Sequence, residues 1–298
     1  MINCVILGTI ALDMIRVSKI NIEKRYGGTA IYASFAASLF SEVGIISIIG
    51  NNFPKDILVR LNNKEIDTNH LQIKGKTFEW EAEYNKDMNE AKTLRTDLNC
   101  LIEFNPIVPD EYKKAEYVFI GNTDPEHQLK IISQFDSSKI ILLDTMNFWI
   151  DSKRDKLLEV ISKVDILIIN DQEARSLFNK INLKECAAEA LKLGLKSIII
   201  KKGEHGVMIF DKDNIFIVPG YPLDILKDPT GCGDSFGGTV IGYLAKNEYS
   251  FNNLKKALLY ATAIASYNAQ GFGSDIIESL THDKIQERVD EIINLTKI

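Results

Sequence analysis

The chain has 298 residues, a length that suits one large domain or two small ones, and its 45% hydrophobic and 26% charged content is ordinary for a globular protein. The net charge is −6 and no block of lysine and arginine stands out, which argues against nucleic acid as a partner, because neutralising phosphates requires a basic face. The four cysteines and four histidines are dispersed, which argues against a zinc site and suits a reducing compartment.

The first fifteen residues are apolar but interrupted by Asp13, and they lack a basic lead-in. They predict a first strand and turn instead of a signal peptide. No stretch approaches the roughly 20 apolar residues that a membrane span requires. We therefore expect a cytoplasmic protein that does not contact membranes.

Short apolar runs along the chain predict buried strands, and helix-like segments alternate with them. The expected strands are 4–8, 43–50, 117–121, 139–144, 164–170 and 197–203. The expected helices are 30–40, 183–194, one that begins near Gly233, and further helices in 253–295. Runs that are apolar on both faces are typical of a mostly parallel sheet covered on both sides. The alternation predicts a doubly wound α/β fold, which binds ligands beyond the carboxyl ends of its strands.

The segment 75–99 breaks this rhythm. Phe78, Trp80, Ala82 and Tyr84 alternate with mostly charged neighbours, the period of a strand with one polar face. Such strands predict either a small accessory sheet acting as a lid or an ordinary edge hairpin. No Pro-rich linker or repeat is present, so we expect a single domain over 1–298 with a lid contributed by roughly 10–26 and 72–100.

The stretch KDPTGCGDSFGG, residues 227–238, places four glycines and two carboxylates directly before a predicted helix. Free backbone N–H groups and the positive end of the helix dipole meet at such a helix start, which favours an anion. Asp234 in this position is either a helix cap or a general base beside an anion hole.

This loop closely resembles the carboxyl-terminal signature of the ribokinase-like (PfkB) carbohydrate kinases, D-x-x-G-A-G-D. The match is D-P-T-G-C-G-D, with Cys232 where the family usually carries a smaller residue. The resemblance implies that Asp234 removes the proton from the substrate hydroxyl. It also implies that the backbone N–H groups of Gly231, Cys232 and Gly233 stabilise the charge on the transferring phosphoryl group.

Two further stretches in the family's order imply contacts with the nucleotide. NDQEA, residues 170–174, matches the N-x-x-E motif, in which Asn170 reaches the ATP phosphates and Glu173 organises Mg²⁺ through water. A capping box would explain the same pair without a ligand. KKGEHG, residues 201–206, matches a turn that borders the nucleotide at Gly203 and Gly206, and a β-hairpin turn is the structural alternative.

The substrate side of the resemblance is less complete. GGTAIYAS, residues 27–34, resembles the di-glycine motif that lies against the substrate, which implies substrate contacts for Gly27 and Gly28; a glycine turn before a helix is the alternative. The N-x-D element of ribokinase is ALD here, so Asp13 remains and Ala11 cannot hydrogen-bond. The Asn that follows the di-glycine motif in ribokinase is replaced by Tyr32.

These losses argue against ribose itself, because a pocket built for particular hydroxyls discriminates strongly. Asn122 is expected to supply another substrate contact. Phe78, Trp80 and Tyr84 could cover a sugar ring, stack on a nucleobase or pack in the core beneath the lid.

The sequence thus predicts an ATP- and Mg²⁺-dependent sugar kinase. A nucleoside kinase is the alternative within the family, and a non-catalytic sugar or nucleotide sensor is the alternative outside it. Asp228 matches a position that helps some relatives bind a monovalent cation, which leaves K⁺ dependence open. Some relatives pair through their lid sheets, and the apolar face of 78–84 permits such a homodimer.

Overall fold

The computed structural model describes residues 2–17, 20–21, 25–84, 88, 91–136 and 140–297. The parts of the expected lid at 18–19, 22–24, 85–87 and 89–90, and residue 139 of the expected strand 139–144, lie outside the described residues. Within the described ranges, no helix is both long and apolar enough to cross a bilayer.

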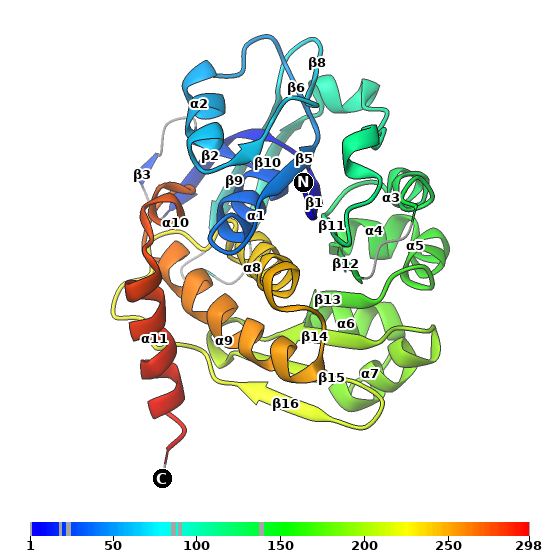
Figure 1. The fold of residues 1–298 in the computed structure, drawn as a ribbon, viewed down its shortest axis with the longest axis vertical. Helices are drawn as coiled ribbons and strands as arrows, with labels where there is room; N and C mark the ends of the chain where they lie inside the picture. Colours follow the sequence, from blue (N-terminus) through cyan, green and yellow to red (C-terminus); the bar gives the residue numbers. More distant parts are fainter. Residues whose placement is uncertain are drawn as a thin grey trace.

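A large, mostly parallel sheet forms the centre of the molecule (Figure 1). Its described strands lie in the order β16-β15-β14-β13-β12-β11-β1-β5-β7, and all neighbours are parallel except β14 with β15 and β15 with β16. Their bounds are β1 Cys4–Leu7, β5 Val43–Ile46, β7 Ile66–Asp67, β11 Tyr117–Ile120, β12 Ile140–Asp144, β13 Ile166–Asn170, β14 Ser197–Lys201, β15 Val207–Phe210 and β16 Ile215–Val218.

Helices cover both faces of this sheet, because alternate strand residues point to opposite sides and both sides are apolar. Ile6 belongs to a core cluster shared with α1, α8, α9, α10 and α11, whereas Val5 and Leu7 belong to another shared with α3 to α7. The first group is α1 Thr29–Ala37, α8 Cys232–Asn247, α9 Phe251–Asn268, α10 Asp275–Ser279 and α11 His282–Asn294. The second group is α3 Pro125–Ile132, α4 Asn147–Ser152, α5 Arg154–Ile161, α6 Asp171–Phe178 and α7 Leu183–Lys192. The predicted doubly wound fold is therefore confirmed.

One expected strand is divided. The run 43–50 breaks at Ser47, whose hydroxyl donates to the Gly8 carbonyl at 2.7 Å. β5 stays in the central sheet, whereas β6 (Ile48–Ile49) pairs with β8 (Gln72–Ile73) in a separate two-stranded sheet. The remaining described elements are α2 Lys55–Asn63 and the 3₁₀ turns η1 Asn99–Glu103, η2 Asp110–Tyr112 and η3 Gly203–His205.

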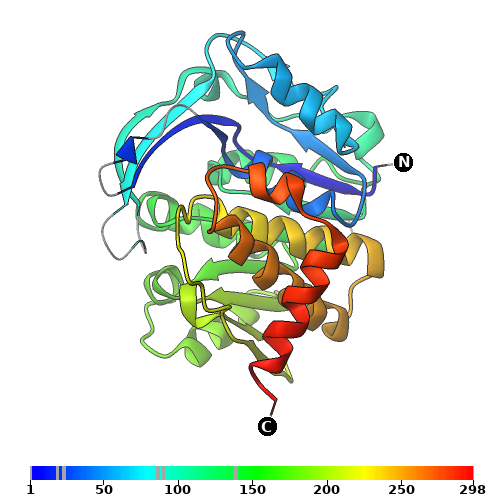
Figure 2. The same ribbon diagram turned by 90° about the vertical axis from the view of Figure 1, so that its left-hand side faces the viewer.

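A second, smaller sheet lies apart from the central one, at the upper left of Figure 2. It consists of β2 Ala11–Val17, β3 Ile20–Asn21, β4 Arg25–Gly27, β9 Phe78–Tyr84 and β10 Ala91–Asp97. β2 runs parallel to β9, and the other pairs are antiparallel. Residues 78–84 and 91–97 thus belong to an accessory sheet with residues 11–17, 20–21 and 25–27, and the edge-hairpin interpretation is wrong.

The order of the central strands has one switch point. From β1 the chain proceeds to β5 and β7 on one side and then returns to β11, β12, β13 and β14 on the other. Loops that leave β1 and β11 therefore diverge at their carboxyl ends, which is where sheets of this kind bind ligands.

Candidate active site

The amino-terminal end of α1 lies over this switch point. The Thr29 side chain contacts Gly121, the residue that follows β11, so closely that a Cβ at Gly121 would overlap it. The Thr29 hydroxyl also donates a hydrogen bond to the Asp234 carboxylate. The loops after β4, β11 and the start of α8 therefore converge around one threonine, which the sequence analysis did not single out.

The loop before α8 ends in a left-handed residue. Gly231 has φ +76°, and a Cβ there would overlap the ring of Tyr32. Position 231 therefore requires glycine, because only glycine adopts that conformation without strain and allows the Tyr32 ring to approach. This accounts for one of the four glycines in 227–238. Gly238 is a second position that requires glycine, because its missing side chain lets α8 approach the Ala33 backbone of α1. α8 begins at Cys232, close to the predicted start near Gly233.

Asp234 lies in the first turn of α8 and is partly exposed. Removal from water raises the pKa of Asp234 to about 6, and the nearby Asp144 carboxylate adds to the rise, while Thr29 and Lys201 oppose it. A carboxylate with a pKa close to neutral is suited to accept a proton at physiological pH.

Asp13, in β2, is the second acid of the site and is 3% exposed. It accepts a hydrogen bond from the Gly28 backbone, and a Cβ at Gly27 would overlap its carboxylate. Burial, together with the negative charges of Asp234 and Asp228, raises the pKa of Asp13 to about 8. The structure therefore places Asp13, Gly27 and Gly28 in one group and Asp13 within the electrostatic reach of Asp234.

Three polar residues end adjacent parallel strands at the same edge of the sheet: Asp144 in β12, Asn170 in β13 and Lys201 in β14. Lys201 Nζ lies 3.5 Å from Asp144 Oδ1. Glu173 follows in the first turn of α6 and is 8% exposed. Burial raises the pKa of Glu173 to about 7, against the lowering effect of Lys201.

Asn170 and Glu173 form the capping box that the sequence left as an alternative. The Asn170 side chain accepts from the Glu173 N–H, and the Glu173 carboxylate accepts from the Asn170 N–H, both at 2.8 Å. One Glu173 oxygen is occupied in this way. The box does not exclude a ligand role, because it holds the second carboxylate oxygen at the strand edge.

Gly203 and Gly206 lie in the turn that joins β14 to the antiparallel β15, so the hairpin alternative for this motif is also present. Gly206 has φ +91°, and a Cβ there would overlap the Val218 carbonyl. Gly203 has φ +54° and faces open space.

Asp228 supports the loop that precedes α8. Its carboxylate accepts from the Thr230 N–H at 2.9 Å and from the Gly273 backbone, and it is 3% exposed. Asn268 donates to the Thr230 carbonyl at 2.8 Å and to Cys232 Sγ at 3.3 Å. The segment 268–273 is thereby packed against 228–232.

Asn122 follows β11 and already has partners within the protein. Its Oδ1 accepts from the Trp149 indole at 2.8 Å, and its Nδ2 donates to Met146 Sδ at 2.9 Å. These contacts fix the carboxamide at the carboxyl edge of the sheet.

The apolar face of β9 is directed toward the loop that precedes α8 and contains Thr230. Tyr84 is buried, and its hydroxyl is hydrogen-bonded to that of Thr230 at 3.1 Å. Trp80 is half-buried, pairs in register with Asp13, and donates its indole N–H to Thr93 Oγ1 at 3.2 Å. Of the three aromatic residues of β9, Tyr84 therefore packs in the interior, whereas Phe78 and Trp80 keep partial exposure.

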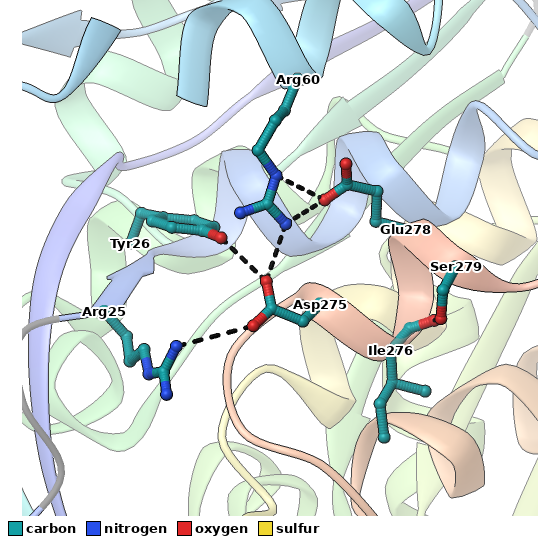
Figure 3. A network of polar contacts seen from close by, with 7 residues as sticks. All are labelled: Arg25, Tyr26, Arg60, Asp275, Ile276, Glu278 and Ser279. Atoms are coloured by element: carbon teal, nitrogen blue, oxygen red, sulfur yellow. Dashed lines mark hydrogen bonds and ion pairs between the residues drawn. The ribbon is translucent and has the colours of Figure 1, made fainter. Parts of the chain in front are cut away.

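A charged network joins β4 and α2 to α10, in the carboxyl-terminal part of the chain (Figure 3). Asp275 of α10 accepts from the Tyr26 hydroxyl at 2.8 Å and from Arg60 of α2 at 2.7 Å, and Arg25 lies 3.6 Å away. Arg60 also pairs with Glu278 and stacks over the Tyr26 ring. Tyr26 directly precedes the di-glycine motif, so the network anchors the strand that delivers Gly27 and Gly28.

Comparison with known proteins decides the family. The model of the pfkB family of carbohydrate kinases matches residues 1–280. The chain belongs to this family. It is accordingly a kinase, a transferase of phosphoryl groups, as the motif order predicted.

The relatives include kinases of nucleosides and of sugars. A cytidine kinase of Thermococcus kodakarensis is 29% identical over 250 residues, covering 82% of this chain and 89% of the relative. A fructokinase-2 of Zea mays is 31% identical over 117 residues, covering 38% of this chain and 35% of the relative.

Solved structures agree on the fold. The Methanocaldococcus jannaschii nucleoside kinase, an archaeal member of the ribokinase family, has a TM-score of 0.79 at 24% identity and covers 97% of this chain and 99% of its own. A chain from E. coli solved in complex with ATP and Mg²⁺ has a TM-score of 0.80 at 20% identity and covers 99% of this chain and 100% of its own.

The residues at the strand edge fit a magnesium ion held through water. Asp144, Glu173 and Asp234 give three carboxylates against the single ammonium of Lys201. In the described part of the chain, no three acidic, histidine or cysteine side chains are grouped closely enough to hold a metal by themselves. Mg²⁺ usually keeps several waters and is bound by one or two carboxylates together with substrate phosphates.

Sequence reasoning missed Thr29, Asp144 and Lys201. Asp144 and Lys201 were each inside a predicted strand, and a charged residue that ends an apolar strand was the available signal. Thr29 carried no signal of its own, because its contact with Asp234 joins segments about two hundred residues apart.

Proposed function

We propose that the protein transfers the γ-phosphoryl group of ATP to a hydroxyl of a nucleoside, with Asp234 as the general base. The observation that carries the proposal is the position of Asp234: it lies in the first turn of α8, its pKa is raised to about 6, and the charge of Asp13 is close enough to interact with it. A sensor on the same fold would not need a base with that pKa.

In this mechanism Asp13 and the backbone of Gly27 and Gly28 hold the acceptor's hydroxyl groups. Asp234 takes the proton of the attacking hydroxyl as the new O–P bond forms. The bond from the γ-phosphorus to the bridging oxygen then breaks, and ADP leaves. Backbone N–H groups of Gly231 and Gly233 stabilise the negative charge on the transferring group, whereas that of Cys232 donates to the Pro229 carbonyl at 3.1 Å.

On the nucleotide side, Asn170, Gly203 and Gly206 would border the phosphates, and Glu173 would hold Mg²⁺ through water. The ion neutralises charge on the phosphates when it is bound. Asp228 would support a monovalent cation near the anion hole. A homodimer through the small sheet stays a prediction.

Two observations favour a nucleoside over the free sugar that the sequence suggested. The cytidine kinase matches over 82% of this chain, whereas the fructokinase matches over 38%. Trp80 is half-buried on the same strand face as Tyr84 and lies beside Asp13, so a base attached to a ribose held by Asp13 would meet an aromatic ring.

The test is ADP formation from ATP and Mg²⁺ with cytidine, uridine, adenosine, inosine, ribose and fructose, alongside thermal shifts with a non-hydrolysable ATP analogue. We expect turnover with one or more nucleosides and a higher melting temperature in the presence of that ligand. Turnover with free sugars alone would favour the sugar kinase. Binding of ligands without any turnover would favour the sensor.

A further inference from the structure

Lys201 approaches the start of α8 from the edge of the central sheet. It is the last residue of β14, and its side chain retains 20% exposure. A Cβ built on Gly233 would lie 3.0 Å from Lys201 Nζ. The ammonium group therefore lies beside Gly233, in the first turn of α8.

The contacts of this ammonium group leave it able to bind a further anion. Its separation from Asp144 Oδ1, 3.5 Å, is that of an ion pair and exceeds an ordinary hydrogen bond. Asp144 is 6% exposed, and its Oδ1 has no hydrogen-bond partner in the part of the chain that the structure describes. An ammonium has three N–H donors, and a phosphate oxygen in front of α8 could accept one of them.

The charges around Lys201 keep it protonated. Burial opposes the charged form, but Asp144, Glu173 and Asp234 outweigh that effect and raise the pKa of Lys201 above its usual value. Lys201 in turn lowers the pKa of Asp234 and of Glu173. The lysine is therefore a fixed positive charge between the acids and the helix terminus.

We propose that Lys201 is a catalytic residue that binds the γ-phosphate oxygens during transfer, with Asp144 holding the ammonium group in place before the nucleotide arrives. This proposal rests on the proposed kinase function. Lys201 keeps its proton throughout and forms no covalent bond. Its charge interacts most strongly with the phosphoryl group in the transition state, alongside the N–H groups of Gly231 and Gly233.

The test compares Lys201→Met with a matched control, Lys196→Met. Lys196 lies just before the opposite end of the same strand and pairs with Asp165 at 2.9 Å. For Lys201→Met we expect kcat to fall at least about a hundredfold, as for removal of one transition-state donor. The KM of the acceptor should change by less than about threefold. Lys196→Met should keep the wild-type kcat.

Nucleotide binding supplies a readout that a structural role would not move. Calorimetry on Lys201→Met should give an affinity for the non-hydrolysable ATP analogue at least about tenfold lower, the loss expected for one charge-assisted hydrogen bond. The affinity for ADP, which lacks the γ-phosphate, should stay within about threefold. Equal losses for both nucleotides, or an unchanged kcat, would overturn the proposal.

Removing Lys201 leaves Asp144 and Glu173 without their positive neighbour, so the single variant could fail to fold. The double variant Lys201→Met with Asp144→Asn removes one charge of each sign and restores the balance. If it folds and regains wild-type kcat, Lys201 only balances charge and the proposal is wrong. If it folds and stays inactive with ADP binding kept, while Asp144→Asn alone is active, the proposal holds.

The same measurements separate this proposal from the proposed function. If the wild type neither binds the ATP analogue nor turns over ATP with any acceptor, the kinase function itself fails. If the wild type is active and Lys201→Met is equally active, only the role of Lys201 fails.

Discussion

The hydroxyl groups of Tyr84 and Thr230 lie 3.1 Å apart and join the small sheet to the loop that precedes α8. Both residues are less than 10% exposed. The Thr230 N–H donates to Asp228, and its carbonyl accepts from Asn268, so the small sheet contacts a loop whose backbone is held from two other directions. A change in the position of β9 would therefore be transmitted to the loop that precedes α8.

Tyr84→Phe should keep the ring packing and remove this link. The Thr230 hydroxyl would then be buried with one partner fewer, so we expect the free energy of unfolding to fall by about 1–3 kcal/mol. We also expect a higher KM for the acceptor. Urea unfolding and steady-state kinetics check both. Tyr26→Phe, which removes an exposed hydroxyl bonded to Asp275, is the control and should cost less stability. A Tyr84→Phe protein with wild-type KM would show that the loop does not depend on the small sheet.

Asp234→Asn should separate catalysis from stability. The N-cap of α8 is Gly231 and no side chain caps the helix, so Asp234 is not a cap. The amide keeps the size of the side chain but cannot accept the proton, so kcat should fall at least about a hundredfold while ligand binding persists. The folded state holds the proton of Asp234 up to about pH 6, whereas an unfolded aspartate loses it near 3.8. Stability is therefore lost as pH rises between these values, and the loss is complete above them.

The Asn variant removes that loss, so its melting temperature should exceed that of the wild type at pH 8 by more than at pH 4. An Asp234→Asn protein with nearly unchanged kcat would show that Asp234 is not the base.

The wild-type pH profile should carry the same signature. Because Asp234 must be ionised to accept a proton, kcat/KM should rise through about pH 6, well above the usual range of an aspartate. The groups that set this value are Asp144, which raises the pKa, and Thr29 and Lys201, which lower it, in addition to desolvation. A profile that is flat between pH 5 and 7 would contradict the assignment of the base.

Glu173→Gln distinguishes the magnesium role from the capping box. Glutamine can still accept the Asn170 N–H bond, so the box survives. If Glu173 holds Mg²⁺, the concentration of Mg²⁺ for half-maximal activity should rise. Asp171→Asn, an acid-to-amide change two residues away, is the control; Asp171 pairs with Arg175. Identical Mg²⁺ titrations of Glu173→Gln and the wild type would leave the capping box as the whole explanation.

Trp80→Ala addresses the acceptor. If the indole stacks on a base, nucleoside binding should weaken by roughly 1–3 kcal/mol, and binding of the matching free sugar should change less. The side chain is half-buried, so the melting temperature without ligand should change less than for a fully buried tryptophan, whose loss costs roughly 3–5 kcal/mol. Titrations of the wild type and of Trp80→Ala with the nucleoside and with the free sugar measure both losses of binding. Equal losses for the two ligands would contradict stacking on a base.

The layered fold could be predicted from the sequence because its signals are local. Apolar runs such as 117–121 and 164–170 can be buried only in a sheet covered on both faces, and the glycine-rich stretch before α8 marks a helix start that accepts an anion. Asp234 could be singled out for the same reason, since its position depends on its immediate neighbours in the chain.

The tertiary structure decided which distant groups meet Asp234. Thr29, Asp144 and Lys201 reach it from α1, β12 and β14, and their effect on its pKa depends on distances that no local pattern encodes. It also decided that β9 pairs with β2, which turns Tyr84 toward Thr230 and places Trp80 beside Asp13. Strand pairing across more than sixty residues follows from the packing of the whole chain, so the sequence alone left the small sheet and an edge hairpin equally open.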